Sequence, residues 1–175
     1  MTNKNRFLFF VFLLVLSSAF IACQQNRDPC LEPRIQKLFM GAYATTDTPI
    51  GVITIISVSL PSPVIAPIGS NSGNTLYYGV ASQGHTFALP LSTVSDSCQY
   101  FVQADTTFAP IYADTLSFYY QRQLDFLSNA CGYTYFYNLQ KINTTNHNID
   151  SVILENPGVT TNVNVEHIKV YFHNL

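Results

Sequence analysis

Runs of β-branched and aromatic residues, broken by Pro, Gly, Asn and Ser, recur along the chain at a spacing of about ten residues, which is typical of strands. The predicted strands are 34–43, 51–60, 74–80, 87–92, 98–104, 114–122, 131–142, 149–156 and 165–174. Residues 61–74 contain three prolines and two glycines and predict a long loop, and 124–130 could supply one helical turn at most. Strands without intervening helices indicate an all-β, antiparallel β-sandwich of about 7–9 strands, immunoglobulin-like or jelly-roll-like.

Alternation in the closing strand assigns its two faces. One face carries the apolar Ile168, Val170 and Phe172. The other carries His167, Lys169, Tyr171 and His173. We expect the first set in the core and the second set in solvent. The two histidines lie about 20 Å apart along an extended strand, too far to share a metal ion.

The amino-terminal residues have the pattern of a signal peptide. Lys4 and Arg6 precede an uncharged run from Phe7 to Ala22, which is short for a membrane span of about 20 residues. The run ends at Cys23 after small residues, a pattern that resembles the bacterial lipobox, in which this cysteine is acylated. We expect a signal peptide at 1–22, a lipidated tether at 23–33 and a single sandwich domain at 34–175.

The chain is poor in charged residues. Only 10% of residues are charged, against about 25% in ordinary soluble domains, and no basic run is present. Lys4 and Arg6 would be removed with the signal, which leaves the mature chain more acidic. Nucleic-acid binding is therefore not expected.

Three cysteines follow Cys23, in a chain predicted to reach an oxidising compartment. We favour a disulfide between Cys30 and Cys131, which would fasten the tether to the folded body. Pairing of Cys98 with Cys131 is the alternative. The spacings contain no C-x-x-C pair of a metal site.

Tyr133, Tyr135 and Tyr137 project from one face of a predicted strand and are a possible ligand face that would stack on a sugar. We favour a structural role in one layer of the sandwich, because Cys131 shares this face and its disulfide would draw it inward. The opposite face would carry Phe136 and Ile142.

The order of short motifs resembles an uncharacterised lipoprotein family of the Bacteroidetes. The matching features are Cys23, Cys30-x-x-Pro33, "LFMGAY" (38–43), "LPLS" (89–92), "DTLSFYY" (114–120), "ACGYTYFY" (130–137) and "HIKVYF" (167–172). The resemblance implies an envelope address and a fold, and no catalytic residues. Cys98 does not belong to its pattern.

No catalytic, cofactor-binding or metal-binding residue is assigned, because the chain has no G-x-S-x-G elbow, no D-x-D-x-D loop and no acid pair. We expect a lipoprotein of the outer membrane that serves as a non-enzymatic binding or structural module, with an envelope protein or a glycan as partner. A glycan-binding module or an enzyme with a loop-built site is the alternative. The periplasmic leaflet is favoured, because "CQQNRDP" lacks an acidic run after the cysteine.

Overall fold

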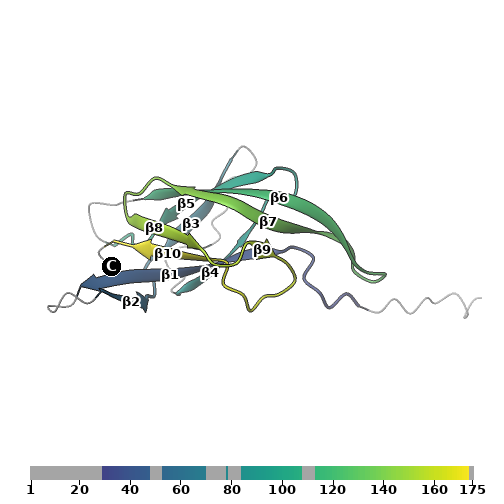
Figure 1. Cartoon of the computed structure of the whole chain (residues 1–175), viewed down its shortest axis with the longest axis horizontal. Coiled ribbons are helices and arrows are strands. Elements are labelled where there is room, and N and C mark those ends of the chain that lie inside the picture. The colour runs from purple at the N-terminus through teal and green to yellow at the C-terminus, as the bar shows by residue number, and fades with distance from the viewer. Residues whose placement is uncertain (1–28, 48–52, 70–77, 79–83, 108–112, 174–175) are drawn as a thin grey trace, which may run out of the picture.

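The computed structural model describes residues 29–47, 53–69, 78, 84–107 and 113–173, which form ten β-strands in two stacked sheets (Figure 1). The first sheet has the order β2-β1-β10-β8, and β4 also pairs with β1. Its strands are β1 (Lys37–Asp47), β2 (Ile53–Ser57), β4 (Thr86–Pro90), β8 (Ile149–Leu154) and β10 (Ile168–Phe172). The second sheet has the order β3-β5-β6-β7-β9. Its strands are β3 (Val64–Ile68), β5 (Ser97–Gln103), β6 (Asp114–Ser128), β7 (Gly132–Thr144) and β9 (Gly158–Val159).

The predicted all-β sandwich is confirmed, with one departure from antiparallel pairing. β1 and β10 pair in parallel, with Met40 opposite Ile168. Every other strand pair of the described residues is antiparallel. The first sheet is therefore mixed, because the closing strand lies beside the first one and runs in the same direction.

The core lies between the inner faces of the two sheets, where alternate residues of each strand are buried. The first sheet contributes Leu38, Met40, Ala42, Phe87, Leu89, Ile168, Val170 and Phe172. The second sheet contributes Ile65, Tyr100, Val102, Leu116, Phe118, Tyr120, Tyr137, Leu139 and Val159.

The predicted loop at 61–74 is wrong in part, because Val64–Ile68 form β3. Among the named strands of the described residues, β3 pairs only with β5, and Pro67 lies opposite Tyr100. A proline at a sheet edge leaves no ladder hydrogen bond unmade, so the proline-rich composition concealed a strand. Of the predicted strand 74–80, only Tyr78 lies within the described residues, where it forms an isolated bridge with Ile65.

The "LPLS" motif receives the hydroxyl groups of three core tyrosines. Tyr100 donates to the carbonyl of Pro90, and Tyr137 donates to that of Leu91. Tyr120 accepts from the Ser92 N–H (2.9 Å) and donates to its carbonyl. A buried tyrosine needs a partner for its hydroxyl, so this connection after β4 allows a tyrosine-rich core.

The closing strand begins at Ile168, and its inner face is as predicted: Ile168, Val170 and Phe172 are buried. The prediction for the other face is wrong for His167, which is only 1% exposed, and for Tyr171, which is also buried. His167 Nδ1 accepts from the Phe39 N–H (2.9 Å), and the two rings stack. Burial lowers the pKa of His167, partly offset by the nearby backbone of Gly158, so this imidazole is a neutral structural acceptor.

The turn from β7 to β8 is closed by the buried carboxylate of Asp114. It accepts from the backbone N–H groups of His147, Asn148 and Ile149 and from the Thr145 hydroxyl. Burial raises the pKa of Asp114, but these hydrogen bonds outweigh it and hold the pKa below its usual value. The carboxylate thus remains charged. It fixes the end of the β6–β7 pair at which β6 begins and β7 ends.

These contacts predict how substitutions in and beside the closing strand affect stability. Phe172→Ala should lower the free energy of unfolding by about 3–5 kcal/mol, as core truncations do. His167→Ala should lower it by about 1–3 kcal/mol, because the partly buried Phe39 N–H loses its acceptor. His173→Ala, at an exposed position, should stay within about 0.5 kcal/mol. Urea unfolding measures all three, and a neutral His167→Ala would contradict the assigned role of this ring.

Candidate functional site

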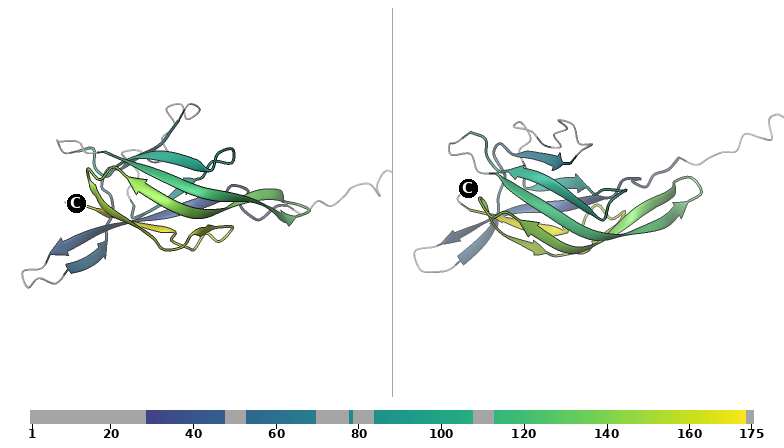
Figure 2. Two further views of the ribbon diagram at one scale, coloured as in Figure 1. Left: turned by 45° about the horizontal axis from the view of Figure 1, so that its top comes forward. Right: turned by 90° about the horizontal axis from the view of Figure 1, so that it is seen from above.

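β6 and β7 run well beyond the rest of their sheet. β5 pairs with β6 only from Asp114 to Tyr119, and β9 pairs with β7 only at Tyr137 and Asn138. Residues 121–136 therefore form a two-stranded projection, here called the arm, that extends past the other strands (Figure 2). The segment 124–130, predicted to be at most a helical turn, is instead the end of β6 and part of the turn at the arm tip.

A β-bulge at the base of the arm changes which β7 residues face the core. Tyr120 pairs with Leu139 and Tyr119 pairs with Lys141, so Gln140 is the extra residue. Beyond the bulge the alternation is shifted by one position, and Ile142 packs against the core. The prediction that Ile142 lies opposite the tyrosine face is therefore wrong.

The core-facing side of β6 continues without interruption onto the arm. Buried Leu116, Phe118 and Tyr120 are followed on the same face by Arg122, Leu124 and Phe126, whose β7 partners are Tyr137, Tyr135 and Tyr133. Tyr137 is buried, Tyr135 is half-buried, and Tyr133 is 67% exposed. The three predicted ligand-face tyrosines thus share a face, but they extend from the core to solvent.

The exposed part of this face is apolar. Leu124, Phe126 and Tyr133 are all exposed, and the rings of Phe126 and Tyr133 lie 5.2 Å apart. Apart from Arg122, the β6 residues of this face are as apolar beyond the sheet as they are beside the core, so the sequence pattern is that of a core strand. This part of the face is uncovered because the neighbouring strands are shorter than β6 and β7. The sequence pattern does not give the lengths of those neighbours.

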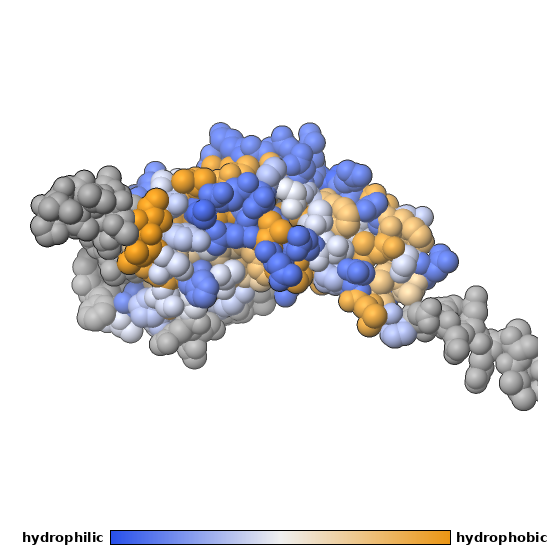
Figure 3. Space-filling model, turned by 60° about the horizontal axis from the view of Figure 1, so that its bottom comes forward, coloured by the Kyte–Doolittle hydropathy of each residue, from blue (hydrophilic) through white to orange (hydrophobic). Residues whose placement is uncertain are grey.

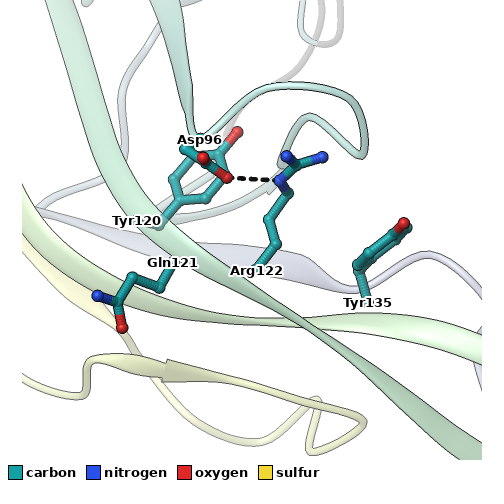
Figure 4. Close-up of a pocket in the computed structure, with 5 residues that line it drawn as sticks. All are labelled: Asp96, Tyr120, Gln121, Arg122 and Tyr135. Carbon is teal, nitrogen blue, oxygen red and sulfur yellow. Dashed lines mark hydrogen bonds and ion pairs between the residues drawn. The ribbon is translucent and has the colours of Figure 1, made fainter.

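A hollow of about 620 Å³ lies at the base of the arm, lined by Asp96, Tyr120, Gln121, Arg122 and Tyr135 (Figure 4). Arg122 Nε donates to Asp96 Oδ1 (2.6 Å), and its Nη1 donates to the Thr93 carbonyl (2.5 Å). The guanidinium carbon also lies 5.7 Å from the centre of the Tyr135 ring. These contacts hold the guanidinium group at a defined position between a carboxylate and an aromatic ring.

Two ionisable groups at the hollow, Arg122 and Tyr120, keep their protons at neutral pH. The Asp96 hydrogen bond raises the pKa of Arg122, which stays charged. Burial is the main cause that raises the pKa of Tyr120, and the nearby Cys98 raises it further. The Tyr120 hydroxyl therefore stays protonated at neutral pH. The hollow therefore offers a fixed cation, a carboxylate and a half-buried ring. Sequence reasoning identified Tyr135 but missed Asp96 and Arg122. These two residues are far apart in sequence, and the turn before β5 brings Asp96 to Arg122 on β6.

The predicted disulfide between Cys30 and Cys131 is confirmed, with a Cα–Cα distance of 4.8 Å. Cys131 lies in the turn at the arm tip, next to Gly132, whose φ of 75° suits a residue without a Cβ. A hydrogen bond from Thr134 Oγ1 to the Arg34 carbonyl (2.7 Å) adds a second link. The segment before β1 is thus attached to the arm.

Cys98 is free, as expected for the cysteine left over, and it is half-buried. Burial raises the pKa of its thiol, which makes it a weak nucleophile. Cys23, the predicted lipidation site, lies outside the described residues. Within the described ranges, no group of three His, Cys, Asp or Glu side chains could hold a metal ion, and no helix is long and apolar enough to cross a membrane.

Comparison with known families places part of the chain in a family. Residues 63–172, more than half of the chain, match the family of unknown function DUF6452. The chain belongs to this family. The DUF6452 match contains the "LPLS" motif, the arm and the hollow, and it begins after Cys23 and Cys30. No curated protein and no solved structure matches the chain.

The crosslink predicts a specific pattern of destabilisation. The bond spans 101 residues, and closing a loop of this length contributes about 4.7 kcal/mol in the chain-entropy model. Cys30→Ser and Cys131→Ser should each lower the free energy of unfolding by about this amount, and the double variant should cost little more than either one. Cys98→Ser serves as the control and should have a much smaller effect. Additive losses from the two single variants would contradict a shared bond.

Proposed function

We propose that this chain is a lipid-anchored protein of the outer membrane whose sandwich is a non-enzymatic binding module in the cell envelope. Lipidation at Cys23, after the signal at 1–22, supplies the anchor. Acyl chains contribute about 0.8 kcal/mol per buried methylene, so several chains on one cysteine hold a soluble domain at a membrane. The periplasmic leaflet is the proposed location.

The observation that carries this proposal is the position of the disulfide. Cys30 follows the lipobox cysteine by only seven positions and is bonded to Cys131 at the arm tip. A covalent link at this point holds the folded domain close to the residue at which the membrane tether begins. It also fits an oxidising compartment, where disulfides persist.

A glycan is the ligand class that the hollow favours. Carbohydrate sites combine an aromatic face, which packs on the apolar side of a sugar ring, with fixed polar groups for its hydroxyls. Tyr135 supplies the ring, and Arg122 and Asp96 supply a donor and an acceptor already held in place. A protein partner is the alternative occupant of the same surface.

The anchor is tested by Cys23→Ser. The variant should leave the membrane fraction or retain its signal peptide, because no thiol is available for acylation. Partition into a detergent phase and the mass of the mature amino terminus measure the result, with Cys98→Ser as the control that should remain anchored. A Cys23→Ser protein that is processed at the same site and still enters the detergent phase would contradict the proposal.

The ligand class is tested by calorimetric titration of the detergent-solubilised protein with soluble oligomers of N-acetylglucosamine. Tyr135→Ala should weaken binding by about tenfold or more, equivalent to about 1.4 kcal/mol. Tyr119→Ala is the matched control, because Tyr119 is exposed on the opposite face of β6. Equal weakening by both variants, or no binding by the unaltered protein, would count against a glycan in the hollow.

A further inference from the structure

Exposed apolar side chains gather at the arm end of the molecule. Leu31 is 90% exposed and Ile35 is exposed in the segment before β1, and Leu124, Phe126 and Tyr133 are exposed on the arm. These five residues are called the apolar end. Figure 3 shows apolar surface at the right of the view, the end at which Figure 1 places the arm. Single exposed apolar residues are ordinary, whereas a group of them at one end indicates a contact surface.

Two links keep the parts of the apolar end together. The disulfide joins Cys30, next to Leu31, to Cys131, which is two positions from Tyr133. The hydrogen bond between Thr134 and the Arg34 carbonyl holds the chain next to Ile35 against β7. Thr134 projects from the face of β7 opposite Tyr133, so the segment before β1 lies on one face of the arm, and Phe126 and Tyr133 are exposed on the other. The apolar end is therefore formed by both faces of the arm, which the two links fix to each other near its tip.

The tether limits the distance between this end and a membrane. This step rests on the proposed lipidation of Cys23. An extended chain spans at most about 3.3–3.6 Å per residue, so the seven steps from Cys23 to Cys30 reach about 25 Å. The arm tip, bonded to Cys30, must remain within this distance of the acylated residue, whereas β2 lies at the opposite end of the sandwich (Figure 1).

We propose that the apolar end docks on the lipid bilayer, with Leu31, Phe126 and Tyr133 at the boundary between headgroups and acyl chains. Tyrosine is favoured at this boundary because its ring is apolar and its hydroxyl is polar, and leucine and phenylalanine insert beside it.

Charge at the apolar end is compatible with a bilayer. The exposed charged residues of the segment, Glu32 and Arg34, have opposite signs and balance each other. Asp125 projects from the face of the arm that carries its partner Thr134, away from Phe126 and Tyr133, so a bilayer without net charge suits this end best. The tether brings the bilayer to this surface at a high effective concentration, which gives lipid an advantage over a free partner.

The chain contains no tryptophan, which makes a single introduced one a specific probe. Phe126→Trp keeps an aromatic ring at the arm tip, and Tyr133→Trp is a second reporter on the opposite strand. The lipidated full-length mature protein is reconstituted in phosphatidylcholine vesicles, with and without brominated acyl chains. Insertion to about 5–10 Å should bring bromine into contact with either tryptophan, reduce its emission about twofold or more and shift it to shorter wavelength. Ile55→Trp, an equally exposed position on β2, is the matched control and should remain unquenched.

Flotation of the same vesicles separates this inference from the proposed anchor. Protein that floats and shows quenching at 126 and 133 but not at 55 supports docking. Protein that floats without quenching at 126 and 133, or with equal quenching at all three positions, overturns docking and leaves the lipid anchor intact. A third outcome is that tryptophan at 126 becomes shielded only as protein concentration rises and is not quenched by bromine. The apolar end would then contact a second copy of the chain, and docking on lipid would be overturned. Protein that does not float overturns the anchor and, with it, the inference.

Discussion

The disulfide between Cys30 and Cys131 is the constraint on which the functional geometry depends. β6 and β7 extend beyond the sheet that should cover them, so the arm lacks the packing that stabilises the rest of the sandwich. An isolated two-stranded hairpin is marginally stable in water. The crosslink holds the arm tip to the segment before β1 and so replaces part of the missing burial.

The base of the arm is held by a second device, the connection between β4 and β5. Tyr120 and Tyr137, on the two arm strands, send their hydroxyls to Ser92 and Leu91. Arg122, one step further out, reaches the carbonyl of Thr93. The arm is therefore fixed at its base by hydrogen bonds and at its tip by a covalent bond, and the hollow lies at the fixed base. Such an arrangement is suited to presenting a rigid surface, because its side chains lose little freedom on binding.

Much of the sandwich could be predicted from the sequence, because the inward positions of β6 and β10 follow strict alternation. The disulfide could also be predicted, because Cys30 and Cys131 lie at plausible strand boundaries in a chain whose amino-terminal pattern predicts export. Local patterns could not reveal β3, where Pro67 resembles a loop residue, or the bulge at Gln140, which carries no distinctive residue type. The contacts of Arg122 at the hollow depend on long-range pairing, which periodicity does not report.

Hydrogen exchange with the disulfide oxidised and then reduced tests the central claim most directly. The account predicts that backbone amides of the arm, residues 121–136, lose protection on reduction. Amides at 115–119 and 141–144, which lie beside the core, should keep theirs, because the sandwich is packed without the bond. An arm that remains equally protected after reduction would contradict the claim that the crosslink holds it in place.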